Sequence, residues 1–293
     1  MRATAAAIGT FDGVHRGHMA VIDYLKRVAR ERDLEPIAIT FDRHPLELIA
    51  PQRAPKGITT IERKTRLLRA AGVRPVVLPF DENLRSTTAG EWMRRLREEF
   101  GVEVLIVGYD NTFGSDGVNL SISDYRRLGE AAGITVEEAP LVEGISSSAI
   151  RKAIAEGDVE RAGEMLGRPF RLSGRVVGGN RLGRTIGFPT ANLLPDPALA
   201  IPANGVYAAE AILPDGSRKP AMVNIGTRPT VRRGEGMTIE ANIIGWKGDL
   251  YGEPLSLDFK SRLRDERQFK SIEALRSQLE KDREAVKKLL SID

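Results

Sequence analysis

The sequence predicts an α/β domain followed by an antiparallel β-barrel domain that one helix closes, and three observations lead to this expectation. Up to about residue 160, short apolar runs alternate with segments of helical periodicity, which is typical of a parallel sheet with crossover helices. From about residue 170, apolar runs follow one another with turn sequences between them, which favours an antiparallel sheet or small barrel. The length of 293 residues also exceeds that of one ordinary domain, which is roughly 100 to 200 residues.

The first half supplies the expected α/β elements in alternation. Strands are expected at residues 4–8, 36–41, 75–80, 102–108 and 134–139. Helices are expected at 19–30, 60–71 and 89–100. In the first of these helices the spacing places four apolar residues on one face: Val21, Ile22, Leu25 and Val28.

The second half supplies the expected barrel. Strands are expected at 170–177, 205–213, 220–226, 237–244 and 255–261, and turns at 213–216, 232–236 and 246–249. Ser271 can cap a closing helix whose apolar face holds Ile272, Leu275, Leu279, Val286 and Leu290. Residues 153–169 are interpreted as a linker with some helix, so the predicted domains are 1–160 and 168–293.

The composition excludes several classes of site. The chain has no cysteine, which excludes disulfides, thiolate zinc sites and cysteine nucleophiles and fits a reducing compartment. The sequence has no apolar run long enough for a membrane helix and no cleavable signal, so we expect a cytoplasmic protein without a membrane partner.

The charge balance permits two kinds of partner. A net charge of +4 and a pI near 9.4 suit nucleic acid or anionic small substrates. Acidic and basic residues are interspersed, and the basic stretch at 63–72 and the mixed stretch at 276–288 are interpreted as solvated helix faces. We therefore expect no nucleic-acid partner, and the sequence leaves a homo-oligomer open.

The stretch "IGTFDGVHRGH", residues 8–18, predicts an anion site. It follows the first expected strand and precedes a helix expected to start near His18, at the sheet edge where such folds bind ligands. Gly9, Gly13 and Gly17 allow close backbone approach, and the helix start directs amides at a ligand. His15 and His18 add donors for phosphate oxygens. The alternative is a pair of turn histidines packed for structural reasons.

A second stretch, "GISSSAIRKAI" at 144–154, predicts a similar site. Ser147 and Ser148 stand at a helix start and Arg151 follows them, an arrangement that can clamp a phosphate. Serine capping beside an exposed arginine is the alternative.

These stretches together resemble the HxGH nucleotidyltransferases, because "GTFDGVHRGH" is followed about 130 residues later by "SSSAIR". The spelling "FDGVHRGH", with "TFDRHP" at 40–45 and "VGYDNTFG" at 107–114, resembles prokaryotic FAD synthetases. Stretches 174–193, 223–230, 239–243, 249–252 and 263–275 resemble riboflavin kinase. The whole chain is thus similar to the bifunctional riboflavin kinase/FAD synthetase family.

The resemblance implies a Rossmann-like nucleotidyltransferase domain that makes FAD from FMN and ATP, and a barrel domain that makes FMN from riboflavin and ATP. Magnesium is implied with ATP. The FMN phosphate is already an anion at neutral pH, so adenylyl transfer needs no general base.

His15, His18 and Arg151 are the expected catalytic residues of the nucleotidyltransferase domain. The expected nucleotide-binding residues are Gly9, Phe11, Gly13, Gly17, His44, Asp110, Ser147 and Ser148. One departure concerns flavin stacking, since Asn111 stands where the family usually has an aromatic residue.

In the second domain, "GGNRLGRT" at 178–185 is one residue from a Walker P-loop, with Arg184 where lysine belongs. The "IGFPT" that follows predicts no helix there, because it contains Gly187 and Pro189. By resemblance, Gly178, Arg184, Gly187, Pro189 and Thr190 bind the nucleotide. Thr190 and Asn192 of "PTAN" are implied to hold magnesium; an ordinary turn is the alternative.

Riboflavin attacks through an un-ionised alcohol, so the kinase site benefits from a carboxylate base. Glu240 in the expected strand "TIEANI" matches the family's catalytic glutamate; an exposed strand glutamate is the alternative. Asp249 and Glu266 are the next carboxylates to consider.

Two other functions stay open: a nucleotidyltransferase for another small phosphate acceptor with an accessory barrel, and a nucleic-acid-binding module.

Overall fold

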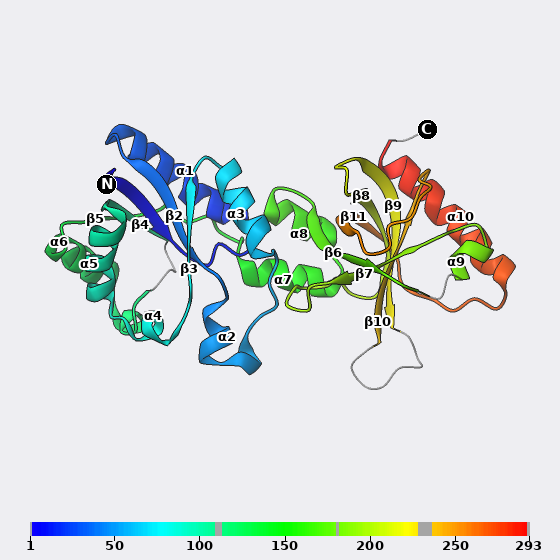
Figure 1. The fold of residues 1–293 in the computed structure, drawn as a ribbon, viewed down its shortest axis with the longest axis horizontal. Coiled ribbons are helices and arrows are strands. Elements are labelled where there is room, and N and C mark those ends of the chain that lie inside the picture. Colours follow the sequence, from blue (N-terminus) through cyan, green and yellow to red (C-terminus); the bar gives the residue numbers. More distant parts are fainter. Residues whose placement is uncertain (1, 109–112, 180–181, 228–235, 292–293) are drawn as a thin grey trace. The chain divides into compact units, whose positions relative to one another are not determined.

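A computed structural model describes residues 2–108, 113–179, 182–227 and 236–291 (Figure 1). The chain divides into two compact units, Met1–Ser147 and Ser148–Asp293. The first unit is a parallel sheet covered by helices and the second is a closed antiparallel barrel with a final helix, so the predicted fold class is confirmed.

The first unit is built on a five-stranded parallel sheet with the order β3-β2-β1-β4-β5. Its strands are β1 (Thr4–Ile8), β2 (Glu35–Phe41), β3 (Arg74–Leu78), β4 (Val102–Val107) and β5 (Thr135–Glu138). Ala6 of β1 pairs with Ile37 of β2 and Leu105 of β4, both in parallel register. The strand order reverses at β1, so the loop after β1 lies at the switch point where parallel sheets bind ligands.

Helices cover both faces of this sheet. They are α1 (Arg16–Glu31), α2 (Pro45–Ile49), α3 (Ile61–Ala70), α4 (Glu82–Ser86), α5 (Ala89–Phe100) and α6 (Ile122–Ala131), with 3-10 turns at Pro51–Arg53 and Gly117–Asn119. Alternate residues of β1 enter two cores: Ala5 and Ala7 pack with the apolar face of α1, and Ala6 and Ile8 pack with that of α5. The five strands and three helices expected in this half are confirmed.

The barrel of the second unit closes in the order β10-β7-β6-β11-β8-β9. Its strands are β6 (Phe170–Val177), β7 (Ala191–Pro195), β8 (Gly205–Ile212), β9 (Arg218–Thr227), β10 (Met237–Ile243) and β11 (Pro254–Arg264). The sequence predicted five of these strands and missed β7, because its first residues are also those of the turn-like "PTAN". The expected turn at 232–236 lies almost entirely outside the described residues.

The segment interpreted as a linker forms two helices, α7 (Ser147–Glu156) and α8 (Val159–Leu166). Asp158 caps α8 by accepting a hydrogen bond from the Arg161 amide at 3.0 Å. The apolar face of α8 is buried and contacts β6 and β11. The Ala203 amide donates to the Ile154 carbonyl at 3.3 Å, so the end of α7 is also held on the barrel unit.

The closing helix is α10 (Ile272–Leu289), and Ser271 caps it as expected, accepting from the Ala274 amide at 3.2 Å. Val286 is fully buried against the barrel. Ile272, however, is 58% exposed, so the first turn of α10 extends beyond the core that its periodicity predicted.

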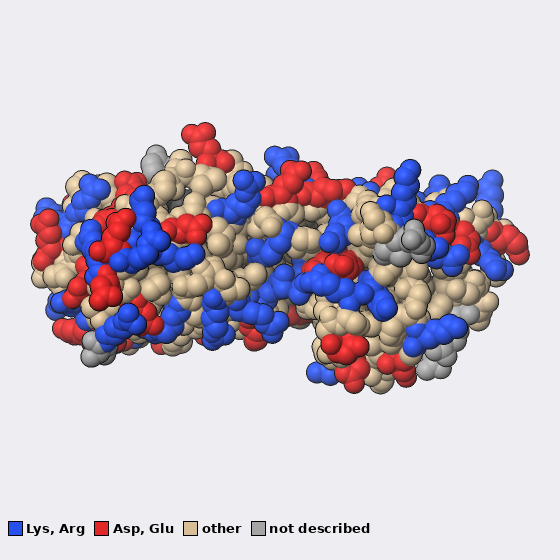
Figure 2. Space-filling view, turned by 90° about the horizontal axis from the view of Figure 1, so that it is seen from above, with Lys and Arg blue, Asp and Glu red and all other residues tan. Residues whose placement is uncertain are grey.

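The described helices include none that combines the length and apolar character needed to cross a membrane. On the face of the molecule drawn in Figure 2, basic and acidic side chains are interspersed, as the sequence indicated. Lys64 is an exception to the solvated helix face expected for residues 63–72, because its side chain is buried.

Candidate active sites

The turn between β1 and α1 has an unusual backbone. Phe11, Gly13 and Val14 all have positive φ, at 46°, 81° and 39°. Residues other than glycine rarely adopt this conformation, and functional sites are where it is commonly retained. The Val14 amide donates to the Phe11 carbonyl at 3.0 Å and closes the turn.

Helix α1 begins at Arg16, two residues earlier than expected, and His15 is its N-cap. The His15 Nδ1 accepts a hydrogen bond from the His18 amide at 3.3 Å. This Nδ1 therefore keeps its lone pair, and the donor of a neutral His15 ring is Nε2. The His15 and His18 rings stack with centroids 3.6 Å apart, and the Phe11 ring meets His18 edge-on at 5.3 Å. The structure thus brings both predicted histidines together at a helix N-terminus, which favours anions.

Asp12 fixes this turn through its carboxylate. It accepts hydrogen bonds from the amides of Ile58 at 3.0 Å and Thr59 at 3.2 Å. The Gly13 amide donates in turn to the Thr59 hydroxyl at 3.2 Å. Sequence reasoning read Asp12 only as part of a motif and missed this role, since its partners lie about 46 residues further along the chain.

The second predicted stretch meets the turn through Ser147, whose hydroxyl donates to the Asp12 carbonyl at 3.1 Å. Ser148 and Arg151 lie on the first turns of α7, within the second unit. Their predicted role in binding phosphate stays a prediction.

Three other predicted residues lie near the same end of the sheet. The Gly9 amide extends the β1 ladder by donating to the Ile39 carbonyl at 3.1 Å. Gly17 is in the first turn of α1, where an added Cβ would lie 3.1 Å from the His15 Nδ1. His44 follows β2 by three residues rather than ending it, and it caps α2 by accepting from the Leu46 amide at 3.2 Å. Asp110 and Asn111 lie outside the described residues.

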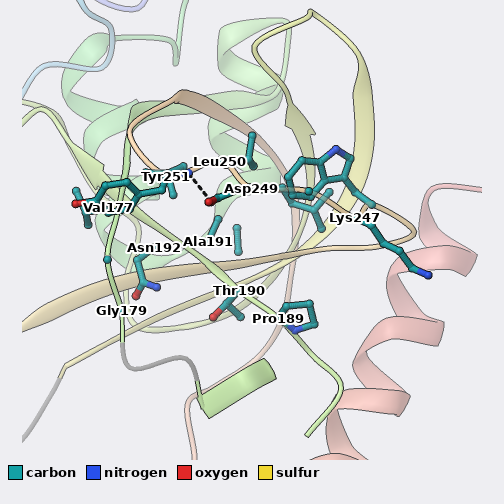
Figure 3. Close-up of a pocket in the computed structure, with 16 residues that line it drawn as sticks. Val177, Gly179, Pro189, Thr190, Ala191, Asn192, Lys247, Asp249, Leu250 and Tyr251 are labelled. Carbon is teal, nitrogen blue, oxygen red and sulfur yellow. Dashed lines mark hydrogen bonds between the residues drawn. The ribbon is translucent and has the colours of Figure 1, made fainter. Parts of the chain in front are cut away.

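A cavity of about 630 Å³ in the second unit lies between strands β6, β7 and β10 and the loop before β11 (Figure 3). Gly178, Pro189, Thr190 and Asn192 all line it. Thr190 and Asn192 are two residues apart on an extended segment and point to the same side in Figure 3. The Asn192 amide packs against Gly179, where an added Cβ would lie only 2.1 Å from the Asn192 Nδ2.

The glycine-rich segment contains a single helical turn, α9 (Leu182–Thr185). The helix ends before "IGFPT", where Gly187 has a φ of 85°. A Walker P-loop requires a long helix after its lysine position, so the structure supports the expectation that this is a different kind of loop. The Arg184 side chain lies outside the described part of the chain.

A second cavity, of about 320 Å³, lies between the barrel and α10. Glu240 is half-buried and lines this cavity together with Asn224 and Asn242. Thr190 lines both cavities. The Asn242 amide donates to the Pro189 carbonyl at 2.7 Å and joins β10 to the "PTAN" segment.

The lining of this second cavity is partly apolar. Phe188 contributes from the barrel side, and Leu275 and Leu279 contribute from α10. Both volumes fall within the range of small-molecule sites, which is about 300 to 1,000 Å³. Both cavities combine apolar and polar side chains, and Thr190 lines both of them.

The two other carboxylates considered from the sequence lie on different cavities. Asp249 lines the larger one and accepts a hydrogen bond from the Tyr251 amide at 2.9 Å (Figure 3). Glu266 lines the smaller one, and its carboxylate packs against Gly226. Glu266 therefore shares a cavity with Glu240, whereas Asp249 does not.

Comparison with known proteins extends over both units. The family model of FAD synthetase matches residues 1–151, and that of riboflavin kinase matches residues 166–290. The bifunctional riboflavin kinase/FMN adenylyltransferase of Pseudomonas fluorescens is 37% identical, over 98% of this chain and 93% of that protein. That of Bacillus subtilis is 35% identical, over 95% and 90%.

A solved structure gives the same extent of likeness. A crystal structure from Streptococcus pneumoniae, described as that of a macrolide-efflux protein, has a TM-score of 0.87 and 31% identity, and covers 98% of this chain and 94% of that chain. The matches to both family models and to full-length relatives show that the chain belongs to the bifunctional riboflavin kinase/FMN adenylyltransferase family.

Proposed function

We propose that this chain makes FMN from riboflavin and ATP within residues 168–293, and FAD from FMN and ATP within residues 1–160. The observation that carries the kinase assignment is the pair of cavities that meet at Thr190, one of them walled by Glu240. The larger cavity accommodates ATP and the smaller one the flavin ring. Thr190 then marks the region where the phosphates and the ribityl chain meet.

In the kinase reaction the ribityl primary hydroxyl attacks the γ-phosphorus of ATP, and ADP leaves. The alcohol must lose its proton as the new P–O bond forms, and the Glu240 carboxylate is the base that accepts it. Asn224 and Asn242 flank Glu240 on the cavity wall and offer amides to orient the ribityl hydroxyls. Gly178, Arg184, Gly187 and Pro189 complete the proposed nucleotide site.

The Thr190 hydroxyl and the Asn192 amide oxygen fit Mg²⁺, which prefers oxygen ligands and keeps phosphates and water in its shell. Among the described residues, no cluster of three or more histidine or acidic side chains offers an alternative metal cage. The ion would supply charge neutralisation at the phosphates of ATP. Thr190 and Asn192 would hold it on their shared side of the chain.

In the adenylyl transfer a phosphate oxygen of FMN attacks the α-phosphorus of ATP, and diphosphate leaves. No base is needed because the attacking oxygen already carries charge.

His15, His18 and Arg151 donate hydrogen bonds to the oxygens on which charge increases, and Ser147 and Ser148 help hold the phosphates. The proposed nucleotide site also includes Gly9, Phe11, Gly13, Gly17, His44 and Asp110.

Incubation with riboflavin and Mg-ATP, followed by chromatography of the flavins, tests both activities at once. We expect FMN to form first and FAD to follow. Formation of neither product contradicts the proposal and returns attention to a nucleic-acid-binding module. FMN without FAD, with FMN supplied as well, would leave the first unit as a nucleotidyltransferase for another phosphate acceptor.

A further inference from the structure

Lys64 is a buried cation beneath the histidine turn. It lies on the second turn of α3, and only 8% of its surface is exposed. Lysine is rarely buried to this extent without partners that compensate for the loss of water. Neither of the proposed reactions uses its amine, so its partners must explain its position.

The partners of Lys64 belong to the turn and to the end of the neighbouring strand. Its Nζ donates to the Thr10 carbonyl at 3.0 Å, the Thr40 hydroxyl at 2.9 Å and the Phe41 carbonyl at 2.9 Å. The Thr40 hydroxyl itself donates to the Thr10 carbonyl at 3.0 Å. Lys64 and Thr40 therefore hold the residue immediately before Phe11, where the positive-φ backbone of the turn begins.

The protonated amine matches this environment. An ammonium group has three N–H donors, and the structure provides three acceptors. A neutral amine has two donors and a lone pair, so one carbonyl or hydroxyl oxygen would face a lone pair. Burial lowers the pKa of Lys64 to about 8, while the carboxylates of Asp12 and Asp42 oppose this shift. The match is thus present at neutral pH and is lost under mildly alkaline conditions.

We propose that Lys64 is a positioning residue for FMN adenylyl transfer. By holding the Thr10 carbonyl, it keeps the turn in the conformation that places His15 and His18 at the start of α1. Asp12 anchors the same turn from its other side, through Ile58 and Thr59. Residues 58–64 therefore form hydrogen bonds with the turn on both sides of Phe11, at Thr10 and at Asp12. This inference rests on the proposed adenylyl transfer in the first unit.

The test compares Lys64→Met with the wild-type chain, since methionine has a similar length and no charge. We expect the turnover of FMN to FAD to fall about 10- to 100-fold, as for a displaced catalytic group. The KM values for FMN and ATP should change much less, and the conversion of riboflavin to FMN in the same molecule should be unchanged. Lys26→Met is the matched control, because Lys26 lies on the surface of the same unit.

A pH profile separates positioning from a general structural role. Wild-type FAD turnover should decline above a pH of about 8, and Lys64→Met should lack this alkaline limb. Thr40→Val provides a second variant if Lys64→Met fails to fold, because it removes the hydroxyl that links Lys64 to Thr10. We expect it to lower FAD turnover in the same direction.

Equal FAD turnover in the wild type and Lys64→Met overturns the inference, as does an alkaline limb that persists in Lys64→Met. Equal loss of both activities also overturns it, because it would make Lys64 a residue of folding alone. Absence of FAD formation by the wild type is a different result, which contradicts the proposed function and not the role of Lys64.

Discussion

At the scale of single residues, the two sites differ in the state of the attacking oxygen. The phosphate of FMN arrives as an anion, so the site proposed for it consists of hydrogen-bond donors around the His15–His18 pair. Riboflavin arrives as an alcohol, so the site proposed for it includes the half-buried Glu240 as a base. Substitutions at these residues should therefore affect one reaction each.

Replacement of His15 or His18 by alanine should stop the pathway after its first step. Each histidine is expected to donate mainly to the transition state, and removal of one such donor costs about 2.7 to 4 kcal/mol of barrier, or roughly 10²- to 10³-fold in rate. FMN should accumulate from riboflavin while FAD does not, which chromatography of the flavins would detect. Equal loss of both activities would instead favour histidines that serve packing of the turn.

Glu240→Gln should lower kinase turnover by about 10²- to 10⁴-fold, because glutamine keeps the shape but cannot accept the ribityl proton. The affinity for riboflavin should change little, since the lost interaction belongs to the transition state. Steady-state kinetics of FMN formation measure both effects, and FAD formation from supplied FMN is the internal control. Kinase turnover within a few-fold of the wild type would move the search to Glu266, which lines the same cavity.

The sequence singles out candidate residues that belong to short motifs, and it misses residues whose contacts come from distant parts of the chain. His15 and His18 could be found because they stand three residues apart beside glycines. Lys64 could not, because it stands among other basic residues and periodicity does not distinguish a buried cation from a solvated one. The contacts of Asp12 could not be predicted either, because the amides that its carboxylate binds come from another part of the chain.

At the scale of elements, α10 completes the smaller cavity and is fixed to the barrel by a buried ion pair. Arg264 of β11 and Asp282 of α10 lie 2.7 Å apart, with side chains 17% and 5% exposed. The Gln278 amide also donates to Asp282 at 2.7 Å. Arg264 also lines the smaller cavity, so the ion pair connects the position of α10 on the barrel with the wall of that cavity.

Asp282→Asn should destabilise the second unit by about 3 to 5 kcal/mol, because it leaves a largely buried guanidinium without its counter-charge. We expect a higher KM for riboflavin as well, since α10 supplies part of the cavity lining. Chemical denaturation and kinase kinetics measure the two effects. Asp265→Asn is the matched control: Asp265 pairs with Arg262 but is 85% exposed, so its loss should cost about 1 kcal/mol or less. Similar results for both variants would contradict the role given to Asp282.

Periodicity predicted the long helices well, whereas β7 was missed because of its local sequence and not because of its length. Segments such as α5 (Ala89–Phe100) have enough turns for an apolar face to emerge. Strand β7 has five residues and begins in a turn-like sequence, so pairing with β6 and β10 decides its conformation. The start of α1 was misplaced because His15 is an uncommon N-cap, and the preference for serine, threonine, aspartate and asparagine gave no signal there.

At the scale of the whole molecule, the second unit includes residues that precede the barrel in the sequence, among them helix α8. The buried face of α8 packs on β6 and β11, and its Asp158 cap is part of the same unit. A kinase fragment that begins after α8 would expose the apolar surface that this helix covers. Removal of a helix of this kind costs several kcal/mol, at about 1.5 to 3 kcal/mol for each fully buried large apolar side chain.

We therefore expect residues 158–293 and residues 168–293 both to phosphorylate riboflavin, with the longer fragment the more stable. Thermal unfolding and FMN formation measure the two properties. A folded 168–293 fragment without kinase activity would contradict the independence of this module. Equal stability of the two fragments would contradict the contribution assigned to α8.

The barrel closes between β7 and β10 through a narrow seam. Among the described residues, Glu240 pairs with Asn192 and Ala241 with Ala191, whereas β9 and β10 pair along the whole of β10. Local opening requires less free energy where fewer ladder hydrogen bonds must break. The proposed base and one proposed magnesium ligand thus face each other across the shortest strand pairing of the barrel. Opening confined to this seam would leave the other five strand pairings of the barrel in place.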